Sequence, residues 1–547
     1  MKKKLLPALI VTGLIVLVII IMGITALINK YTPTKKTEDL KEYFNISSDD
    51  EAALVVDNEL SDYKAKIIDK KIYVDYKFVH DSLNSRFYWD ANENVLLYTT
   101  ASDIISAAAD SNSYSVTKQT NDFGYPIVKA TSDSALIALD YVKQYSNITF
   151  KSYDDPARIV ITSKWDEIDS ATVSKSTQVR VKGGIKSPIL KEVKKDDKIT
   201  LLDSGDKWDK VATEDGVIGY IKSKALSESK KTKLTNPDYE EETFTHIKKD
   251  KDICLAWNQV TSQSANSKVP QVISSTKGIN VMSPTWFYLN DNNGNLADIA
   301  SKDYVSYCHS QGIEVWGLFS NFENTDVDAA YVLTHTSTRT TLINQIMSAA
   351  FNYELDGVNI DFENITEAAY GDSYIEFIRE LAIKCHNNGI SLSVDVTVPA
   401  SFNKFFNRSD MANFADYIVI MGYDEHYKGS DAGSVSSIPW VTEGVESTLK
   451  EVPADQIILG MPFYTRIWEL TPKEDDDAVT DTEDQSKYTV ASQVYSMDAA
   501  AAQLATNNAT AALDEESGQN YAEWSVSNKL YKVWLEDNTS LENRLKL

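Results

Sequence analysis

The stretch Asp356-Gly-Val-Asn359-Ile-Asp361-Phe-Glu363 decides the interpretation of the C-terminal half of this chain. Apolar residues alternate in it with one amide and two carboxylic acids. Because side chains on a strand point alternately to opposite faces, Asn359, Asp361 and Glu363 share one face. Buried charge is costly unless it is paired or used, so the pattern predicts a strand that carries acids into a functional site. The alternative is an edge strand with one solvated face, which the apolar second face disfavours.

Further apolar strands surround this stretch, with helical patterns such as Thr340–Tyr353 and Ser373–Asn387 between them. The other predicted strands are Ile253–Trp257, Ile279–Trp286, Val315–Asn321, Leu392–Thr397, Tyr417–Tyr423 and Ile457–Tyr464. Alternating strands and helices indicate parallel βα units, so seven of them predict a (β/α)8, or TIM, barrel over residues 246–547. The active site of such a barrel lies at the C-terminal ends of its strands.

No segment predicts an eighth strand, because a long insertion (about 468–525) and a helix (528–547) follow the seventh. A barrel with an open seam exposes two strand edges, which is unfavourable. We therefore expect the barrel to be shortened in this chain. An inactive or partner-completed form is the alternative.

The stretch Asp356–Glu363, followed in order by Met421-Gly-Tyr-Asp424, resembles the signature of glycoside hydrolase family 18, the chitinase-like enzymes. The resemblance is closest to the branch of cell-wall and spore-cortex N-acetylglucosaminidases. It implies retaining, substrate-assisted cleavage of a β-linked N-acetylglucosamine bond. Glu363 would be the general acid, Asp361 would orient the substrate's acetamido group, and Tyr423 would hydrogen-bond the acetamido oxygen.

Other side chains at strand ends are expected to bind or line the sugar site. They are Asn359, Asp424, Met421, Trp286, Asn321, Tyr464 and Arg466, with Asp395 and Trp468 as weaker candidates. Asn359 stands where many family members have Asp, so it cannot relay a proton but can donate a hydrogen bond to Asp361. For Trp286 and the other aromatic residues, a place in the packed core is an equal alternative. The run Asp475-Asp-Asp477 predicts a solvated loop, with a calcium site as the alternative.

The N-terminus predicts a membrane anchor over residues 1–36. Three lysines precede an apolar run from Leu5 to about Ile28, which is long enough to cross a bilayer as a helix. A cleaved signal peptide has a shorter core and a small-residue cleavage site, and a buried soluble helix is disfavoured at this length. We expect a single-pass cell-membrane protein with its N-terminus inside and its catalytic domain facing the cell wall.

Two small domains and a linker are predicted between anchor and barrel. Residues 37–168 contain a repeat with an offset of 63 residues, each copy reading as strand, helix, strand and strand. It resembles the small α+β domain at the N-terminus of copper amine oxidases, although no histidine cluster implies copper. Residues 169–227 read as short strands with turns and resemble bacterial Src-homology-3-like barrels. Residues 228–245 are polar and charged, which predicts a linker. The chain is thus expected to be multidomain.

Composition excludes several functions. The net charge of −26 disfavours nucleic acid or an anionic membrane surface as a partner of the soluble part. The three cysteines and six histidines are scattered without ligand spacing, so we expect no metal, no other cofactor and no disulfide framework. Each cysteine lies in an apolar element and is expected to be a small buried hydrophobe. An exported protein of this size without disulfides fits a Gram-positive-type bacterium.

These observations predict a membrane-anchored extracellular glycosidase that acts on peptidoglycan or a chitin-like glycan containing N-acetylglucosamine. A non-catalytic, lectin-like surface protein is the alternative, because some barrels of the family have lost the acid. Retention of Asp361, Glu363 and Tyr423 favours the enzyme. A third alternative is a scaffold whose N-terminal repeats bind an envelope partner.

Overall fold

The computed structural model describes residues 5–363, 365, 370–473 and 484–547. The acidic run 475–477 lies outside these residues. The chain divides into two compact units, of which the first is formed by residues 1–89, 107–114 and 120–241. The second is formed by residues 90–106, 115–119 and 242–547. The domain boundaries inferred from the sequence remain predictions.

Helix α1 (Leu5–Tyr31) contains a segment, Leu9–Tyr31, that is long and apolar enough to cross a membrane. Its apolar side chains from Leu9 to Ile28 are exposed to solvent in the structure. By length and composition, this helix could be either a membrane anchor or a signal sequence.

The repeated order of strand, helix, strand and strand is present in both predicted copies. The first copy is β3 (Lys71–Asp75), α3 (Tyr76–Ser82), β4 (Phe87–Asp90) and β5 (Val95–Thr99). The second is β10 (Ala135–Ala138), α4 (Leu139–Tyr145), β11 (Thr149–Tyr153) and β12 (Arg158–Thr162). The other elements of this region are α2 (Leu40–Tyr43), β1 (Glu51–Val56), β2 (Glu59–Ile68), β6 (Ile104–Ala108), β7 (Ser113–Val116), β8 (Gln119–Asp122) and β9 (Val128–Ala130). Seven strands form one sheet in the order β11-β12-β1-β2-β3-β10-β9.

The region predicted as a small barrel is a second seven-stranded sheet. Its strands are β13 (Glu167–Thr172), β14 (Thr177–Arg180), β15 (Ile189–Val193), β16 (Lys198–Asp203), β17 (Trp208–Thr213), β18 (Ile218–Lys222) and β19 (Lys230–Lys233). They are arranged in the order β15-β14-β18-β17-β16-β13-β19. Strand β19 lies in the segment predicted as a linker and pairs antiparallel with β13.

Seven parallel strands form the centre of the second unit, in the chain order expected of a barrel. They are β20 (Leu255–Asn258), β21 (Val281–Leu289), β23 (Glu314–Ser320), β24 (Gly357–Asp361), β25 (Ser391–Thr397), β26 (Tyr417–Met421) and β27 (Ile457–Gly460). Strand β22 (Leu296–Asp298) adds antiparallel to β21. Strands β20 and β27 are the two edges, and no eighth parallel strand joins them within the residues the structure describes.

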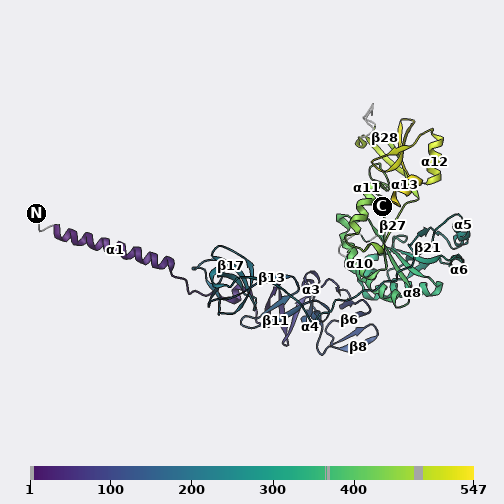
Figure 1. The fold of residues 1–547 in the computed structure, drawn as a ribbon. Helices are drawn as coiled ribbons and strands as arrows, with labels where there is room; N and C mark the ends of the chain where they lie inside the picture. Colours follow the sequence, from purple (N-terminus) through teal and green to yellow (C-terminus); the bar gives the residue numbers. More distant parts are fainter. Residues whose placement is uncertain (1–4, 364, 366–369, 474–483) are drawn as a thin grey trace. The chain divides into compact units, whose positions relative to one another are not determined.

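Helices separate and cover these strands (Figure 1). They are α5 (Val269–Ser274), α6 (Lys302–Ser310), α7 (Ala329–Thr334), α8 (Thr336–Tyr353), α9 (Gly371–His386), α10 (Arg408–Phe414) and α11 (Ile438–Thr448). Val358, Ile360 and Phe362 are completely or almost completely buried. Strand β24 pairs with β23 and β25, so it is a central strand and the edge-strand alternative is wrong.

Contacts at the start of β24 explain why an aspartate and a glycine, Asp356 and Gly357, stand there. The Asp356 carboxylate accepts hydrogen bonds of 2.8 Å from the His309 ring and from the Val315 backbone, which ties it to the neighbouring strand. A Cβ atom on Gly357 would lie 2.5 Å from the Trp316 ring, closer than any real side-chain contact. Only glycine therefore fits where β24 passes this indole, which itself packs in the barrel core.

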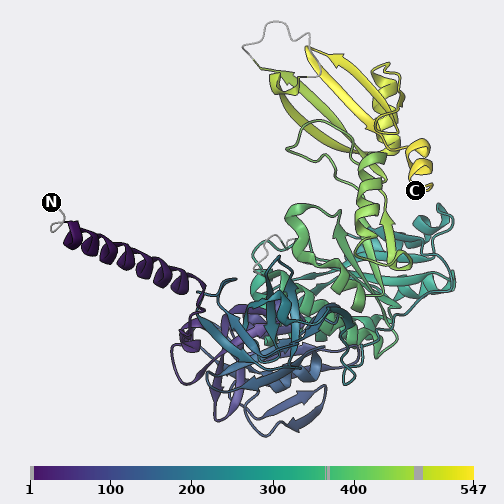
Figure 2. The ribbon, with the colours of Figure 1, turned by 60° about the vertical axis from the view of Figure 1, so that its left-hand side comes forward.

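The insertion after β27 is a sheet of its own, separate from the green and teal barrel strands in Figure 2. Its strands are β28 (Tyr464–Pro472), β29 (Tyr488–Ser496), β30 (Ala512–Asp514), β31 (Gln519–Val526) and β32 (Lys529–Leu535). Their order is β29-β28-β32-β31-β30. Helix α12 (Met497–Thr506) contacts this sheet, and the short helix α13 (Asn538–Arg544) follows it. The long helix predicted over 528–547 is therefore wrong in its first half, where apolar residues alternate as on a strand.

Candidate active site

The C-terminal end of β24 carries the predicted polar face. Asn359 is completely buried, Asp361 is half-buried, and Glu363 just beyond the strand is exposed. Their exposure increases along the chain because the strand rises from the barrel interior to its rim. Strand β24 ends at Asp361, so the expectation that the Glu363 side chain shares the face of Asn359 and Asp361 stays a prediction.

Both the oxygen and the nitrogen of the Asn359 side-chain amide form hydrogen bonds within the barrel. Its Oδ1 accepts hydrogen bonds from Trp257 Nε1 at 3.0 Å and from Ser283 Oγ at 2.9 Å. Its Nδ2 donates to Ser393 Oγ at 3.0 Å and to Asp395 Oδ1 at 2.7 Å. The expected bond from Asn359 to Asp361 is thus replaced by one to Asp395. With every donor and acceptor position of the amide occupied, the expectation that Asn359 binds substrate directly is also wrong in this conformation.

The surroundings of Asp361 favour the protonated form of its carboxyl group. Its Oδ1 is buried and has no hydrogen-bond partner in the described part of the chain. Burial raises the pKa of Asp361 to about 8, and the charges of Glu363 and Glu323 add to this shift. A carboxyl group with such a pKa carries its proton at neutral pH.

Glu363 is attached to the neighbouring strand through its backbone. Its N–H donates a hydrogen bond of 3.0 Å to Oδ1 of Asn321, which is buried at the end of β23. Partial burial raises the pKa of Glu363, and the negative charges of Asp424 and Glu323 raise it further. The backbone of the predicted acid is thus held to the neighbouring strand, and its carboxyl group is biased towards the protonated form that proton donation requires.

Glu323 is a third carboxylate of the site that the sequence reasoning missed. It follows β23 as Glu363 follows β24, and the Ser320 hydroxyl donates to its carboxylate at 2.6–2.7 Å. Ser320 is also the register partner of Asp361. The signal was present in the parallel between Asn321-Phe-Glu323 and Asp361-Phe-Glu363 on neighbouring strands.

A second group of predicted residues meets at the ends of β26 and β28. The Tyr464 hydroxyl donates a hydrogen bond of 2.7 Å to Asp424, and Nη2 of Arg466 lies 3.5 Å from the same carboxylate oxygen. The Tyr423 ring lies edge-on to those of Trp257 and Tyr464, with centroid distances of 6.2 and 6.3 Å. Burial, followed by the nearby carboxylates Asp395 and Asp361, raises the pKa of Tyr423, so its hydroxyl remains a donor.

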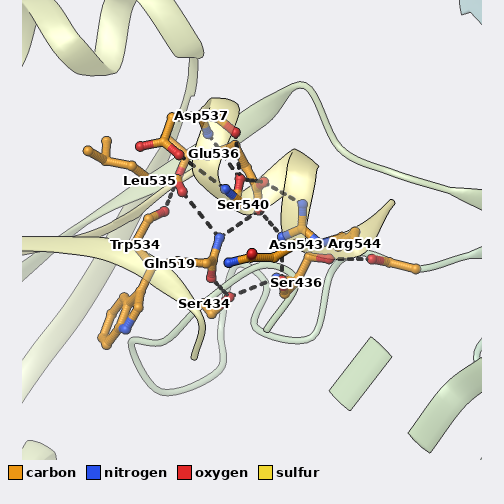
Figure 3. A network of polar contacts seen from close by, with 12 residues as sticks. Ser434, Ser436, Gln519, Trp534, Leu535, Glu536, Asp537, Ser540, Asn543 and Arg544 are labelled. Carbon is orange, nitrogen blue, oxygen red and sulfur yellow. Dashed lines mark hydrogen bonds and ion pairs between the residues drawn. The ribbon is translucent and has the colours of Figure 1, made fainter. Parts of the chain in front are cut away.

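A buried network around Arg544 (Figure 3) reaches the backbone beside Tyr423. Arg544 forms two hydrogen bonds with the buried Glu536, at 2.6 and 2.7 Å, and donates to the backbone carbonyl of Ser436. The Ser436 hydroxyl in turn donates at 2.6 Å to the carbonyl of Gly422, the residue before Tyr423. Helix α13 is thus connected to the backbone that positions Tyr423.

Two predicted aromatic residues lie elsewhere. Trp286 is completely buried, and its Nε1 donates to Asn266 at 2.8 Å. Trp468 is also completely buried, and its Nε1 donates to the Gly433 carbonyl at 2.8 Å. Both indoles are core side chains with satisfied donors, so the prediction that they contact sugar is wrong. Met421 is almost fully buried at the end of β26, where little of its surface could reach a ligand.

The described residues contain no group of three or more His, Cys, Asp or Glu side chains arranged to hold a metal ion. Cys308 and Cys385 are buried, as expected, but Cys254 is exposed, which contradicts the prediction for that residue. It lies just before the edge strand β20, where one side has no neighbouring strand within the described chain.

Residues 323–547, which include both groups of the site, match the model of Glycosyl hydrolases family 18. The C-terminal part of this chain contains a family 18 domain. The chain is 25% identical over 194 residues to the uncharacterized glycosylase YvbX of Bacillus subtilis, a match that covers 33% of this chain. It is 23% identical over 265 residues to the cortical fragment-lytic enzyme of Bacillus subtilis, covering 47% of this chain.

The chain spans 55% and 58% of the lengths of these two relatives. Among solved structures, it is similar to a chitinase from Chromobacterium violaceum, with a TM-score of 0.45 and 19% identity. That match covers 53% of this chain and 87% of the chitinase. It is also similar to the Bacillus megaterium spore cortex-lytic enzyme SleL, with a TM-score of 0.45, 18% identity, and coverage of 53% and 66%.

Proposed function

We propose that the family 18 domain hydrolyses a β-linked N-acetylglucosamine bond, with Glu363 as the general acid. The observation that carries the proposal is the pair of neighbouring carboxyl groups with raised pKa values at the rim of β24, Asp361 and Glu363. A glycosidic oxygen is a poor leaving group until it is protonated. Glu363 combines a raised pKa with solvent exposure, so it can deliver a proton to a bound substrate.

Asp361 takes the supporting role in this proposal. Its unpartnered Oδ1 faces no donor within the described residues, so a substrate acetamido N–H is free to occupy that position. In the substrate-assisted route, the acetamido oxygen attacks the sugar carbon while Glu363 protonates the leaving oxygen. Asp361 stabilises the cation that forms once it has lost its own proton, since only the carboxylate carries the opposite charge. Asn359 acts one layer deeper, where it holds Asp395 rather than the sugar.

Asp424, Tyr464 and Arg466 form the proposed sugar-binding wall, with Tyr423 beside them. The carboxylate of Asp424 already accepts from Tyr464, and it has a second oxygen for a sugar hydroxyl. Arg466 Nε is buried without a partner in the described chain, while its Nη2 lies near Asp424. Such a mixture of fixed donors and acceptors is suited to orienting hydroxyl groups.

We further propose that the substrate is a cell-wall glycan and that α1 holds the domain at the membrane. The name of one relative, a cortical fragment-lytic enzyme, supports a peptidoglycan-derived substrate. The exposed apolar surface of α1 supports the anchor. Removal of residues 1–36 should move the protein from the membrane fraction to the soluble fraction, and continued sedimentation with membranes would contradict the anchor.

The activity is tested with Glu363→Gln in the full chain, using N-acetylglucosamine oligosaccharides and purified peptidoglycan. We expect release of reducing ends by the wild type and a loss of at least about 100-fold in kcat for the variant. The same substitution at exposed Glu446 on α11 is the matched control and should leave kcat unchanged. Full activity of Glu363→Gln would refute the assignment. Glycan binding by the wild type without any turnover would favour the lectin-like alternative.

A further inference from the structure

The insertion sheet has a groove of about 430 Å³ on one face, which we call the back groove. Side chains from four strands and from α12 and the residue that follows it line this groove. Six of them matter here: Glu469, Gln493, Gln503, Asn507, Trp524 and Tyr531. Its volume lies within the range of small-molecule sites in proteins.

The back groove is on the opposite face of the sheet from the proposed active site. Along β28, Tyr464 and Arg466 point towards Asp424, whereas Ile467 and Glu469 have the other parity. Successive side chains on a strand point to opposite faces, so the groove residues of β28 and its two wall residues lie on opposite faces of the strand. Ile467 packs with Leu504 of α12, which confirms that α12 covers this second face.

An aromatic platform forms one part of the groove. Trp524 on β31 and Tyr531 on β32 are register partners whose rings stack with a centroid distance of 5.4 Å and an interplanar angle of 8°. Both side chains are only half-buried, so ring surface remains open to solvent. Large, flat aromatic surface next to polar groups is typical of binding sites, because one contact supplies apolar area and the neighbours supply hydrogen bonds.

The polar groups of the groove include amides and one carboxylate whose charge is paired with a lysine. Glu469 accepts hydrogen bonds from Lys529 at 2.5 Å and from the Tyr531 hydroxyl at 2.7 Å, and these bonds lower its pKa. The Gln503 side-chain amide makes no hydrogen bond within the described part of the chain, and Gln493 uses its oxygen only towards Tyr495. The lining therefore offers free amide donors and acceptors with its single negative charge already paired.

We propose that the back groove is a second, non-catalytic saccharide site that binds a neutral sugar segment of a glycan. The open aromatic face fits the apolar C–H face of a pyranose ring, and the amides fit its hydroxyl groups. The paired charge of Glu469 disfavours an anionic ligand, because no unpaired cation of the lining would meet it. The groove would hold a polymer on the insertion sheet independently of what happens at Glu363.

The proposal is tested by retention of the full chain on insoluble peptidoglycan and chitin, in a Glu363→Gln background that prevents digestion. We expect Trp524→Ala to lower the bound fraction at least fivefold and Gln503→Ala to lower it two- to threefold. Trp524→Phe keeps a flat ring and should retain at least half of the binding. Glu523→Gln changes the next residue on the opposite face and should bind like the parent protein.

Measurements of turnover distinguish an effect on the back groove from an effect on the active site. With Glu363 intact, Trp524→Ala should leave kcat/KM on a short soluble oligosaccharide unchanged. Gln503→Ala removes only a half-buried amide, so it tests the groove even if Trp524→Ala does not fold. If Gln503→Ala and a folded Trp524→Ala both bound the insoluble glycans as well as the parent protein does, the proposal would be overturned. The proposal would also be overturned if these substitutions weakened binding to a protein but never to peptidoglycan or chitin.

Discussion

The side-chain amide of Asn359 donates a hydrogen bond of 2.7 Å to the buried carboxyl group of Asp395, on the next strand, and not to Asp361 on its own strand. Burial raises the pKa of Asp395 well above its ordinary value, and the charge of Asp361 raises it further. The amide thus donates to a carboxyl group that the charge of Asp361 disfavours in its ionised form. Its position explains why an uncharged residue is compatible with this layer of the barrel.

Asn359→Asp should destabilise the protein more at alkaline than at acidic pH. An ionised carboxylate at this position would face Asp395, and even a protonated carboxyl group can donate only one of the two hydrogen bonds that Nδ2 now makes. We expect a loss of about 1–3 kcal/mol in the free energy of unfolding at pH 5 and a larger loss at pH 8. Denaturant titration at both pH values measures it. Equal losses at the two pH values would contradict the proposed role.

Asp361→Asn should stabilise the folded protein as pH rises while abolishing turnover. The folded-state pKa of Asp361, about 8, is raised above that of an unfolded aspartate. Its contribution to stability is therefore fully present below about pH 4 and is lost as pH rises towards 8. The Asn variant lacks this loss. The difference in Tm between variant and wild type should grow from pH 4 to pH 8, and a constant difference would show that Asp361 does not titrate in this range.

Glu323→Gln should move the alkaline limb of the kcat/KM profile to lower pH. The charge of Glu323 raises the pKa values of both Asp361 and Glu363, so its removal makes both lose their protons earlier. We expect a shift of about one pH unit. Asp326→Asn removes an equal charge from an exposed position three residues away and should shift the profile much less. The same shift in both variants would assign the effect to net charge instead.

Arg544→Met should cost about 3–5 kcal/mol of stability, because it leaves Glu536 buried without its partner. The double variant Arg544→Met/Glu536→Gln should recover a substantial part of that loss, since the orphaned charge is then removed. Chemical denaturation of both variants and of Glu536→Gln completes the cycle. Strictly additive losses would show that the pair is not energetically coupled. Residual activity should show a higher KM, because the Ser436 backbone that holds Gly422, next to Tyr423, loses its bond to Arg544.

Much of the barrel could be read from the sequence because its signals are local. The period-two pattern of Val358, Ile360 and Phe362 follows from strand geometry, and the structure buries all three. The insertion was harder to interpret. Lys529–Leu535 forms a strand only because β28 and β31 lie on either side of it, so its short alternating pattern did not outweigh the helical interpretation. Trp286 was misplaced because a strand-end position does not reveal which face is covered, and Trp468 because the strand that contains it was not predicted.

The sequence by itself predicted that Asn359, Asp361 and Glu363 share one face at the end of one strand, and it placed Asn359 and Asp361 two residues apart on that strand. That follows from backbone geometry alone. Only the tertiary structure decided their partners: Asp395 for Asn359, Asn321 for the Glu363 backbone, and Glu323 as a neighbouring charge. Those partners come from adjacent strands, 36 to 42 residues away for the two hydrogen bonds. Strand order and register bring them together, and neither is encoded within the stretch itself.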